Sequence, residues 1–261
     1  REGSKNPQLA LMEGLSLGSD HQVFNEGSWR IPGIYLHDWP DRYIHTNFDT
    51  AAMIDPTKLK RAAFIAALQG WYLANFDSGD VAPALELLRA NALQRARGLA
   101  IKLPILNEQD RAAAFDVHWQ VESLKIQSVS DFASMDRTEV AEAAAFIRGL
   151  QELLGRPAQV TAGGDERVFS RNPELKGTMD AFGYSYLQDH LFTDDYAGLS
   201  LSGAHAYEAL NLVDGTRTVS GIRDWLVAEF ASATSTIALA DVAKYLEALE
   251  NINVIQLKSG H

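Results

Sequence analysis

Residues 31–50 read IPGIYLHDWPDRYIHTNFDT, and this stretch decides the fold that the first part of the chain is expected to adopt. The run from Ile31 to His37 is apolar and β-favouring, with Pro32 and Pro40 as its boundaries. It predicts a buried strand. A loop dense in histidine and aspartate follows, and functional side chains gather on such loops at strand ends in α/β folds.

A long helix is predicted directly after this loop. Asp55 supplies an N-cap and Pro56 a first helical residue. The following segment, KLKRAAFIAALQGWYLANF at 58–76, is apolar over a wide stripe, which is typical of a helix that lies against a sheet. Residues 1–78 are therefore predicted to be part of an α/β sheet domain that ends at DSGD, 77–80.

A shorter helix is predicted upstream, where Ser19, Asp20 and His21 precede the apolar pair Val23 and Phe24. Polar residues before an apolar pair indicate a helix N-terminus, with Ser19 or Asp20 as the cap. Capping of backbone N–H groups alone would account for these residues, so the pattern leaves a functional role open.

The remaining chain divides into two predicted regions. Residues 79–160 have helical spacing, with helices expected near 81–98, 108–127 and 136–155, the last starting at Asp136 with Glu139 in a capping box. Residues 161–261 predict three short helices and a terminal strand, with Thr218 capping the second helix, an arrangement that resembles a winged-helix module. The fold class predicted for the whole chain is mainly α with an α/β part.

Composition and charge narrow the classes of function. The chain has 261 residues, 46% of them hydrophobic and 22% charged, which is typical of a globular protein, and it contains no apolar run long enough to span a membrane. The net charge of −11 argues against nucleic-acid and anionic-membrane partners. Residues 166–261 hold 7 Lys and Arg against 13 Asp and Glu, so their winged-helix-like part is expected to dock a protein or to be structural.

The order of these segments resembles a known family. GSDHQVF at 18–24, IPGIYL at 31–36 and YIHTNFDT at 43–50, followed by a helix that starts with Asp-Pro, is similar to the end of the two-zinc exopeptidase domain of metallopeptidase family twenty-eight. That family includes leucyl aminopeptidases, glutamate carboxypeptidase and glutaminyl cyclases. The resemblance covers about residues 1–76 and implies peptide-bond hydrolysis by metal-activated water, two zinc ions, a peptide substrate and a secreted or periplasmic location.

The resemblance also implies roles for individual residues. His45 matches the C-terminal zinc ligand of the family, since a neutral imidazole on a loop suits zinc. Ser19, Asp20 and His21 match the segment that lines the substrate pocket near the amine of the peptide, where a carboxylate would meet an ammonium group. The polar residues after His45 would fix the ligand loop; they are Thr46, Asp49 and Thr50.

The other zinc ligands and the general base of this family lie upstream of the segment that matches GSDH. One imidazole cannot hold two zinc ions, so we expect the 261-residue chain alone to be inactive and a longer parent protein to be the peptidase. An alternative is a non-catalytic interaction module that keeps a vestigial peptidase segment and binds a protein partner through residues 79–261. A DNA-binding regulator is a third interpretation, which the acidic charge disfavours.

Overall fold

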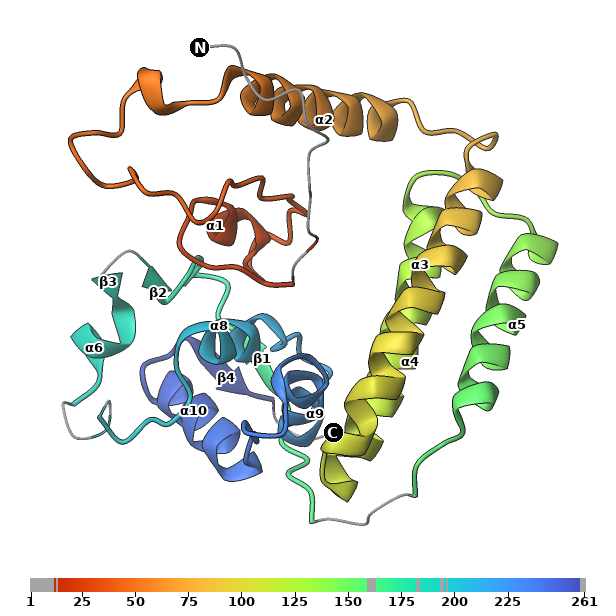
Figure 1. Cartoon of the computed structure of the whole chain (residues 1–261). Helices are drawn as coiled ribbons and strands as arrows, with labels where there is room; N and C mark the ends of the chain where they lie inside the picture. Colours follow the sequence, from red (N-terminus) through yellow and green to blue (C-terminus); the bar gives the residue numbers. More distant parts are fainter. Residues whose placement is uncertain are drawn as a thin grey trace.

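The computed structural model describes residues 12, 14–158, 163–181, 184–192, 195 and 197–258. This part of the chain is mainly helical, and its strands form two small antiparallel pairs, β1 with β4 and β2 with β3 (Figure 1). The predicted mainly α class is confirmed. No helix in the described ranges is long and apolar enough to cross a bilayer.

The N-terminal region contains α1 (His21–Asn25), the 3-10 turn η1 (Ala51–Met53) and α2 (Pro56–Ala74). The predicted long helix is confirmed together with its cap, because Asp55 Oδ1 accepts from the backbone N–H of Thr57 at 2.8 Å and of Lys58 at 3.3 Å. Figure 1 shows α2 at the edge of the molecule, and none of its residues is buried. The sheet expected beneath it does not form within residues 14–78.

The strand predicted at Ile31–His37 was wrong. The segment belongs to no helix or strand, and its side chains are exposed, with Ile34 keeping 66% of its surface in solvent. A β-favouring sequence becomes a strand only when a neighbouring strand satisfies its backbone N–H and C=O groups. The described part of the chain pairs its strands elsewhere, so this segment has no such neighbour.

The middle region is a set of three long helices, as predicted. They are α3 (Val81–Lys102), α4 (Glu108–Gln127) and α5 (Arg137–Leu154), with the 3-10 turns η2 (Leu103–Ile105) and η3 (Ser128–Asp131) at their connections. The capping box of α5 is confirmed: Asp136 accepts from the backbone of Glu139, and the Glu139 carboxylate accepts from the backbone N–H of Asp136 at 2.8 Å. Each of the three helices packs on the other two (Figure 1).

We call residues 163–258 the C-terminal module. Its strands are β1 (Phe169–Arg171), β2 (Asp180–Ala181), β3 (Tyr184–Ser185) and β4 (Ile255–Leu257). Its helices are α6 (Tyr186–His190), α8 (Gly203–Asn211), α9 (Val219–Phe230) and α10 (Leu239–Asn251). The three predicted helices and the terminal strand are present, and β4 pairs antiparallel with β1.

Local signals placed these last elements correctly. Thr218 Oγ1 accepts from the backbone N–H of Gly221 at 3.0 Å and so caps α9, as predicted. The predicted inward face of α10 is buried. It consists of Val242, Tyr245, Leu246 and Leu249.

One hydrophobic core joins the middle region to the C-terminal module. It runs from Val81 to Ile255, and α4 packs along α9 at its centre. A buried ion pair between Asp110 of α4 and Arg223 of α9 crosses the same contact, and Arg223 also donates to the carbonyl of Ile237 at 3.0 Å. Among the described residues, those from 14 to 75 contribute nothing to this core.

Candidate functional site

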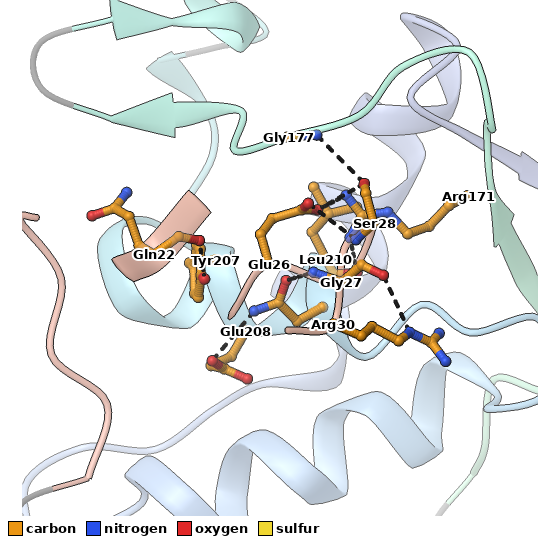
Figure 2. Close-up of polar contacts among 11 residues, drawn as sticks. Gln22, Glu26, Gly27, Ser28, Arg30, Arg171, Gly177, Tyr207, Glu208 and Leu210 are labelled. Carbon is orange, nitrogen blue, oxygen red and sulfur yellow. Dashed lines mark hydrogen bonds and ion pairs between the residues drawn. The ribbon is translucent and has the colours of Figure 1, made fainter. Parts of the chain in front are cut away.

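Residues 18–30, which we call the α1 segment, dock on the C-terminal module instead of joining the core. Gln22 and Glu26 are 3% and 1% exposed, although both are polar. Buried polar groups must find partners, since an unpaired one costs free energy. Gln22 Oε1 accepts from the backbone N–H of Gly18 at 2.8 Å, and Gln22 Nε2 donates to the carbonyl of Asp180 in β2 at 3.5 Å. Glu26 pairs with Arg171 of β1 (Figure 2).

Glu26 and Arg171 form the central contact of this docking. The guanidinium of Arg171, at the end of β1, pairs with the Glu26 carboxylate, which also accepts from the backbone N–H of Ser28 at 3.0 Å and from its hydroxyl at 3.1 Å. Arg171 further donates to the carbonyl of Leu210 at 3.3 Å. Burial lowers the pKa of Arg171, and the charge of Glu26 opposes that change. Each charge therefore makes burial of the other tolerable.

Two further hydrogen bonds hold the backbone of the segment. The Tyr207 hydroxyl of α8 donates to the carbonyl of Gln22 at 2.6 Å, and the N–H of Gly27 donates to Asn211 Oδ1 at 2.8 Å. Gly27 has no room for a side chain, because a Cβ there would lie 2.6 Å from Arg171 Nη1 and 3.2 Å from Asn211 Cα. Glycine at this position permits the close approach.

The predicted pocket residues lie at the start of α1. Asp20 occupies the N-cap position as expected, but its exposed side chain makes no capping hydrogen bond, so side-chain capping by Asp20 was wrong. The carbonyl of Ser19 accepts from the Gln22 N–H at 3.2 Å. His21 Nε2 lies 2.5 Å from the carbonyl oxygen of Ser16, while its Nδ1 is buried without a hydrogen-bond partner.

Three aromatic rings link α1 to the loop that follows it. The His21 ring stacks on Tyr35 with centroids 4.2 Å apart and an angle of 8° between the planes. Tyr35 stacks in turn on His37 at 4.9 Å and 21°. The structure therefore brings His21 next to part of the IPGIYLH segment, which the residue pattern alone did not predict.

The loop that carries His45 is a compact exposed turn. His45 has a φ of 60°, a left-handed conformation that is uncommon outside glycine. Asp41 Oδ1 accepts from the Tyr43 N–H at 2.8 Å, and the Thr46 hydroxyl donates to the Tyr43 carbonyl at 2.6 Å. Thr46 therefore fixes the loop on both sides of His45.

The two other residues expected to fix this loop follow Thr46 closely. The Asp49 N–H donates to the Thr46 carbonyl at 3.2 Å. Thr50 stands at the N-cap of η1, and its side chain makes no capping bond there. Both contribute through their backbones, so among the three residues only Thr46 uses its side chain in a hydrogen bond to this loop.

The described residues do not fit a complete zinc site. No group of three or more His, Asp or Glu side chains in these ranges is placed to hold a metal ion. A zinc centre takes four ligands, three of them from protein in catalytic sites. Asp38, which is near His37 in sequence, is engaged with Lys58 Nζ at 2.8 Å. His45 can serve as one ligand only, and further donors would have to come from other protein surface.

A second group of ionisable residues lies where α3 meets the C-terminal module. Lys102 Nζ donates to the carbonyl of Ala228 at 2.6 Å and to that of Val227 at 3.3 Å, near the C-terminus of α9. Burial raises the pKa of Glu229 to about 7, with the charge of Glu208 acting in the same direction and Lys102 opposing it. Burial lowers the pKa of Lys102, while its hydrogen bonds to the carbonyls near the end of α9 stabilise the end of that helix.

Sequence reasoning missed the docking residues Glu26, Arg171 and Tyr207. Glu26 and Arg171 are 145 positions apart, and neither belongs to a motif that would mark it. The only local signal is Glu26 itself, a charged residue placed in the turn-forming run that follows α1. Comparison of the chain with known protein families, curated proteins and solved structures found no match.

Proposed function

We propose that residues 14–76 are the C-terminal part of a zinc-dependent exopeptidase of the aminopeptidase type, which hydrolyses peptide bonds with metal-activated water. His45 is then one zinc ligand, and Thr46, Asp49 and Thr50 hold its loop. Ser19, Asp20 and His21 line the pocket that receives the amine of the peptide. The remaining ligands of the two zinc ions and the general base come from protein surface that packs on this region.

The observation that carries this proposal is the large apolar surface of residues 23–73. Isolated monomers rarely expose contiguous apolar patches of more than a few hundred Å². In this range, however, aromatic and aliphatic side chains stay in solvent along the whole segment, as a region built to be covered by an apolar sheet would require. The largest exposed fractions belong to Ile34, Trp39, Phe48, Phe64 and Trp71, at 66%, 65%, 64%, 65% and 65%.

The proposal is tested by a pair of measurements. The 261-residue chain alone should release no aminoacyl group from an aminoacyl p-nitroanilide in the presence of zinc, because it holds a single candidate ligand. In the parent protein, His45→Ala should abolish turnover and lower the zinc content, while His190→Ala, at an exposed histidine on α6, should retain both. Turnover by the isolated chain, or an unchanged zinc content in His45→Ala, would contradict the proposal.

A second candidate function rests on the same exposed surface. A non-catalytic module with a vestigial peptidase segment would use its apolar residues, together with residues 79–261, to bind a protein partner. The coding sequence upstream of Arg1 separates the two, since a His-x-Asp motif, a Glu-Glu pair and a further acidic ligand there would favour the peptidase. Without them the interaction module is the better interpretation.

The C-terminal module contributes to either function as a winged-helix-like unit. Three helices, α8, α9 and α10, with the β1–β4 ribbon beside them are the parts that such a unit needs. The exposed side of α10 presents Lys244 and Glu247, both of which are already engaged, with the Gly198 carbonyl and Arg167 respectively. A helix without free basic residues is poorly suited to phosphates, so we assign the module to protein docking instead of DNA binding.

A further inference from the structure

The contacts between the α1 segment and the C-terminal module converge on one short turn. Tyr207 holds the carbonyl of Gln22 within α1, and Arg171 holds the carboxylate of Glu26 directly after it (Figure 2). Gly27 follows, with its N–H on Asn211. Three successive elements of the chain, a helix, its C-cap and the residue beyond, are thus bound to β1 and α8.

The helix α1 cannot orient itself without these contacts. It has five residues, and isolated helices need roughly 12 or more residues to be even marginally stable in water. Its first residue is His21, its N-cap is Asp20, and Gln22 is the next residue along. A displacement of Gln22 from Tyr207 therefore moves Asp20 and His21, two of the three residues that we assign to the substrate pocket.

The aromatic stack extends this dependence beyond α1. Because His21 lies on Tyr35 and Tyr35 lies on His37, the position of the His21 ring also sets the start of the loop that leads to His45. The backbone contributes as well, since the Ile31 N–H donates to the Phe24 carbonyl at 3.0 Å. Residues 29–37 are exposed, so α1 and the turn directly after it are their main anchor.

We infer that the C-terminal module positions the substrate pocket, with Arg171 and Tyr207 as positioning residues that act through α1 on Asp20 and His21. The pocket role of Asp20 and His21 rests on the proposed function, whereas the anchoring of α1 does not. In this inference the C-terminal module determines the position of pocket residues, although it supplies none of them itself.

Arg167 provides a matched control for Arg171. It lies on the same module, four residues before Arg171, but its partners are Asp165 and Glu247 of the module itself, with distances of 2.6 Å and 2.7 Å. Removing its charge disturbs the module without touching the α1 segment. Both Arg167→Gln and Arg171→Gln remove an ion pair of the module, but only the second removes one that reaches α1. Arg171 is also the more buried of the two, with 11% of its side chain exposed against 37% for Arg167, so a report on the fold of the module is needed beside them.

The first experiment uses the 261-residue chain and needs no enzymatic activity. Two quantities are measured: amide hydrogen exchange over residues 19–30, and the imidazole NMR signals of His21, which the variant His21→Gln assigns. Both are compared among Arg171→Gln, Tyr207→Phe, Gly27→Ala and Arg167→Gln. The first three should raise exchange in the segment by about tenfold or more and shift the His21 signals as the ring leaves Tyr35. Arg167→Gln should leave both unchanged, and Arg171→Lys should restore part of the wild-type behaviour.

Amide protection in α10 reports whether the module itself remains folded. If Arg171→Gln also loses that protection, Gly27→Ala decides. It keeps both charges and adds only a methyl group, which meets Arg171 Nη1 and Asn211 Cα where the segment approaches the module. Unchanged exchange and unchanged His21 signals in Gly27→Ala and in the Arg171→Gln/Tyr207→Phe double variant would overturn the inference.

The second experiment uses the parent protein. Arg171→Gln should raise KM for a peptide substrate by about tenfold, with kcat and zinc content nearly unchanged. The reason is that the turn around His45 keeps its own hydrogen bonds, from Asp41 and Thr46 to Tyr43, when the start of the loop moves. A shifted His21 signal with an unchanged KM would overturn the pocket role and leave the peptidase proposal standing. An inactive parent would instead overturn the proposed function, while the exchange and NMR results would still decide whether the module positions α1.

Discussion

The helices α2 and α10 are both rich in apolar residues, yet they differ in burial. α10 has 13 residues and buries five of them, from Val242 to Leu249, in the core of the C-terminal module. α2 has 19 residues and buries none. Apolar composition thus shows that a helix needs a partner surface, but whether this chain supplies that surface depends on which other elements it contains.

The difference extends from the helices to their regions. The C-terminal module and the middle region share one core, tied across α4 and α9 by Asp110 and Arg223. The N-terminal region is joined to the rest through polar contacts of the α1 segment and, at its end, through the ring of Phe76, which lies against Phe132. None of its described apolar side chains is buried. We therefore expect the two parts to respond differently to equivalent substitutions.

The largest expected effect is on the buried ion pair. Asp110→Ala leaves the Arg223 guanidinium inside the protein without its carboxylate, which should lower the free energy of unfolding by about 3–5 kcal/mol. Asp38→Ala removes the carboxylate that pairs with Lys58 on the exposed N-terminal region, and it should leave the unfolding transition unchanged. Urea denaturation followed by circular dichroism measures both. Equal effects would remove the contrast between the two regions.

Core truncation should have a slightly smaller effect. Leu246→Ala opens a cavity at a residue that is 0% exposed and should cost about 2–5 kcal/mol of unfolding free energy. Leu68→Ala makes the same chemical change on α2, where the leucine is 48% exposed, and should cost less than about 0.5 kcal/mol. The same denaturation measurements apply. A substantial loss in Leu68→Ala would mean that α2 has a partner surface in solution.

The exposed face of α2 predicts binding of an apolar dye. Phe64, Leu68 and Trp71 follow one another at helical spacing and are all exposed, so changing the three to glutamine should reduce anilinonaphthalene sulfonate fluorescence by about half. Lys60→Gln, on the exposed surface of the same helix, is the control and should leave the signal unchanged. Full retention of the signal in the triple variant would place the dye-binding surface elsewhere.

The smallest expected effect concerns pH. The folded-state pKa of Glu229, about 7, exceeds its ordinary value of 4.5, so the folded state favours the protonated form. Its contribution to stability is present below pH 4.5 and is lost as the pH rises through 7. Glu229→Gln should therefore raise the melting temperature at pH 8 and leave it unchanged at pH 4.

Because Glu229 is exposed, solvent screens its charge, and we expect a gain of less than about 1 kcal/mol at pH 8. Asp241→Asn, on α10 of the same module, serves as the control for the loss of one negative charge. A gain in Glu229→Gln that is the same at pH 4 and pH 8 would contradict the assignment of the raised pKa.

Local signals predicted the helices of residues 79–160 because the forces that define them act over three or four residues. α4 begins and ends where its pattern indicated, and the capping box of α5 joins residues that are three apart in sequence. The strand at Ile31–His37 failed for the opposite reason. β-Favouring residues can form one strand of a sheet, but the neighbouring strand that must pair with it comes from a distant segment of the chain.

The candidate site shows the same division. The pattern located α1 and the turn around His45, and the resemblance assigned roles to Asp20, His21 and His45 that remain predictions. The stack of His21 on Tyr35 and the pairing of Glu26 with Arg171 had no local signature. Both contacts depend on which distant segments the fold brings next to α1, and the spacing of residues within the α1 segment does not predict those segments.

The sequence by itself determined the long helices, the caps of α2, α5 and α9, the acidic charge and the buried face of α10. Helix hydrogen bonds and apolar periodicity are properties of neighbouring residues, so local sequence is enough to predict them. Tertiary structure alone decided that Asp110 meets Arg223 and that Glu26 meets Arg171, 113 and 145 positions away. A buried charge is tolerated only beside its partner, and only the folded chain brings such partners together.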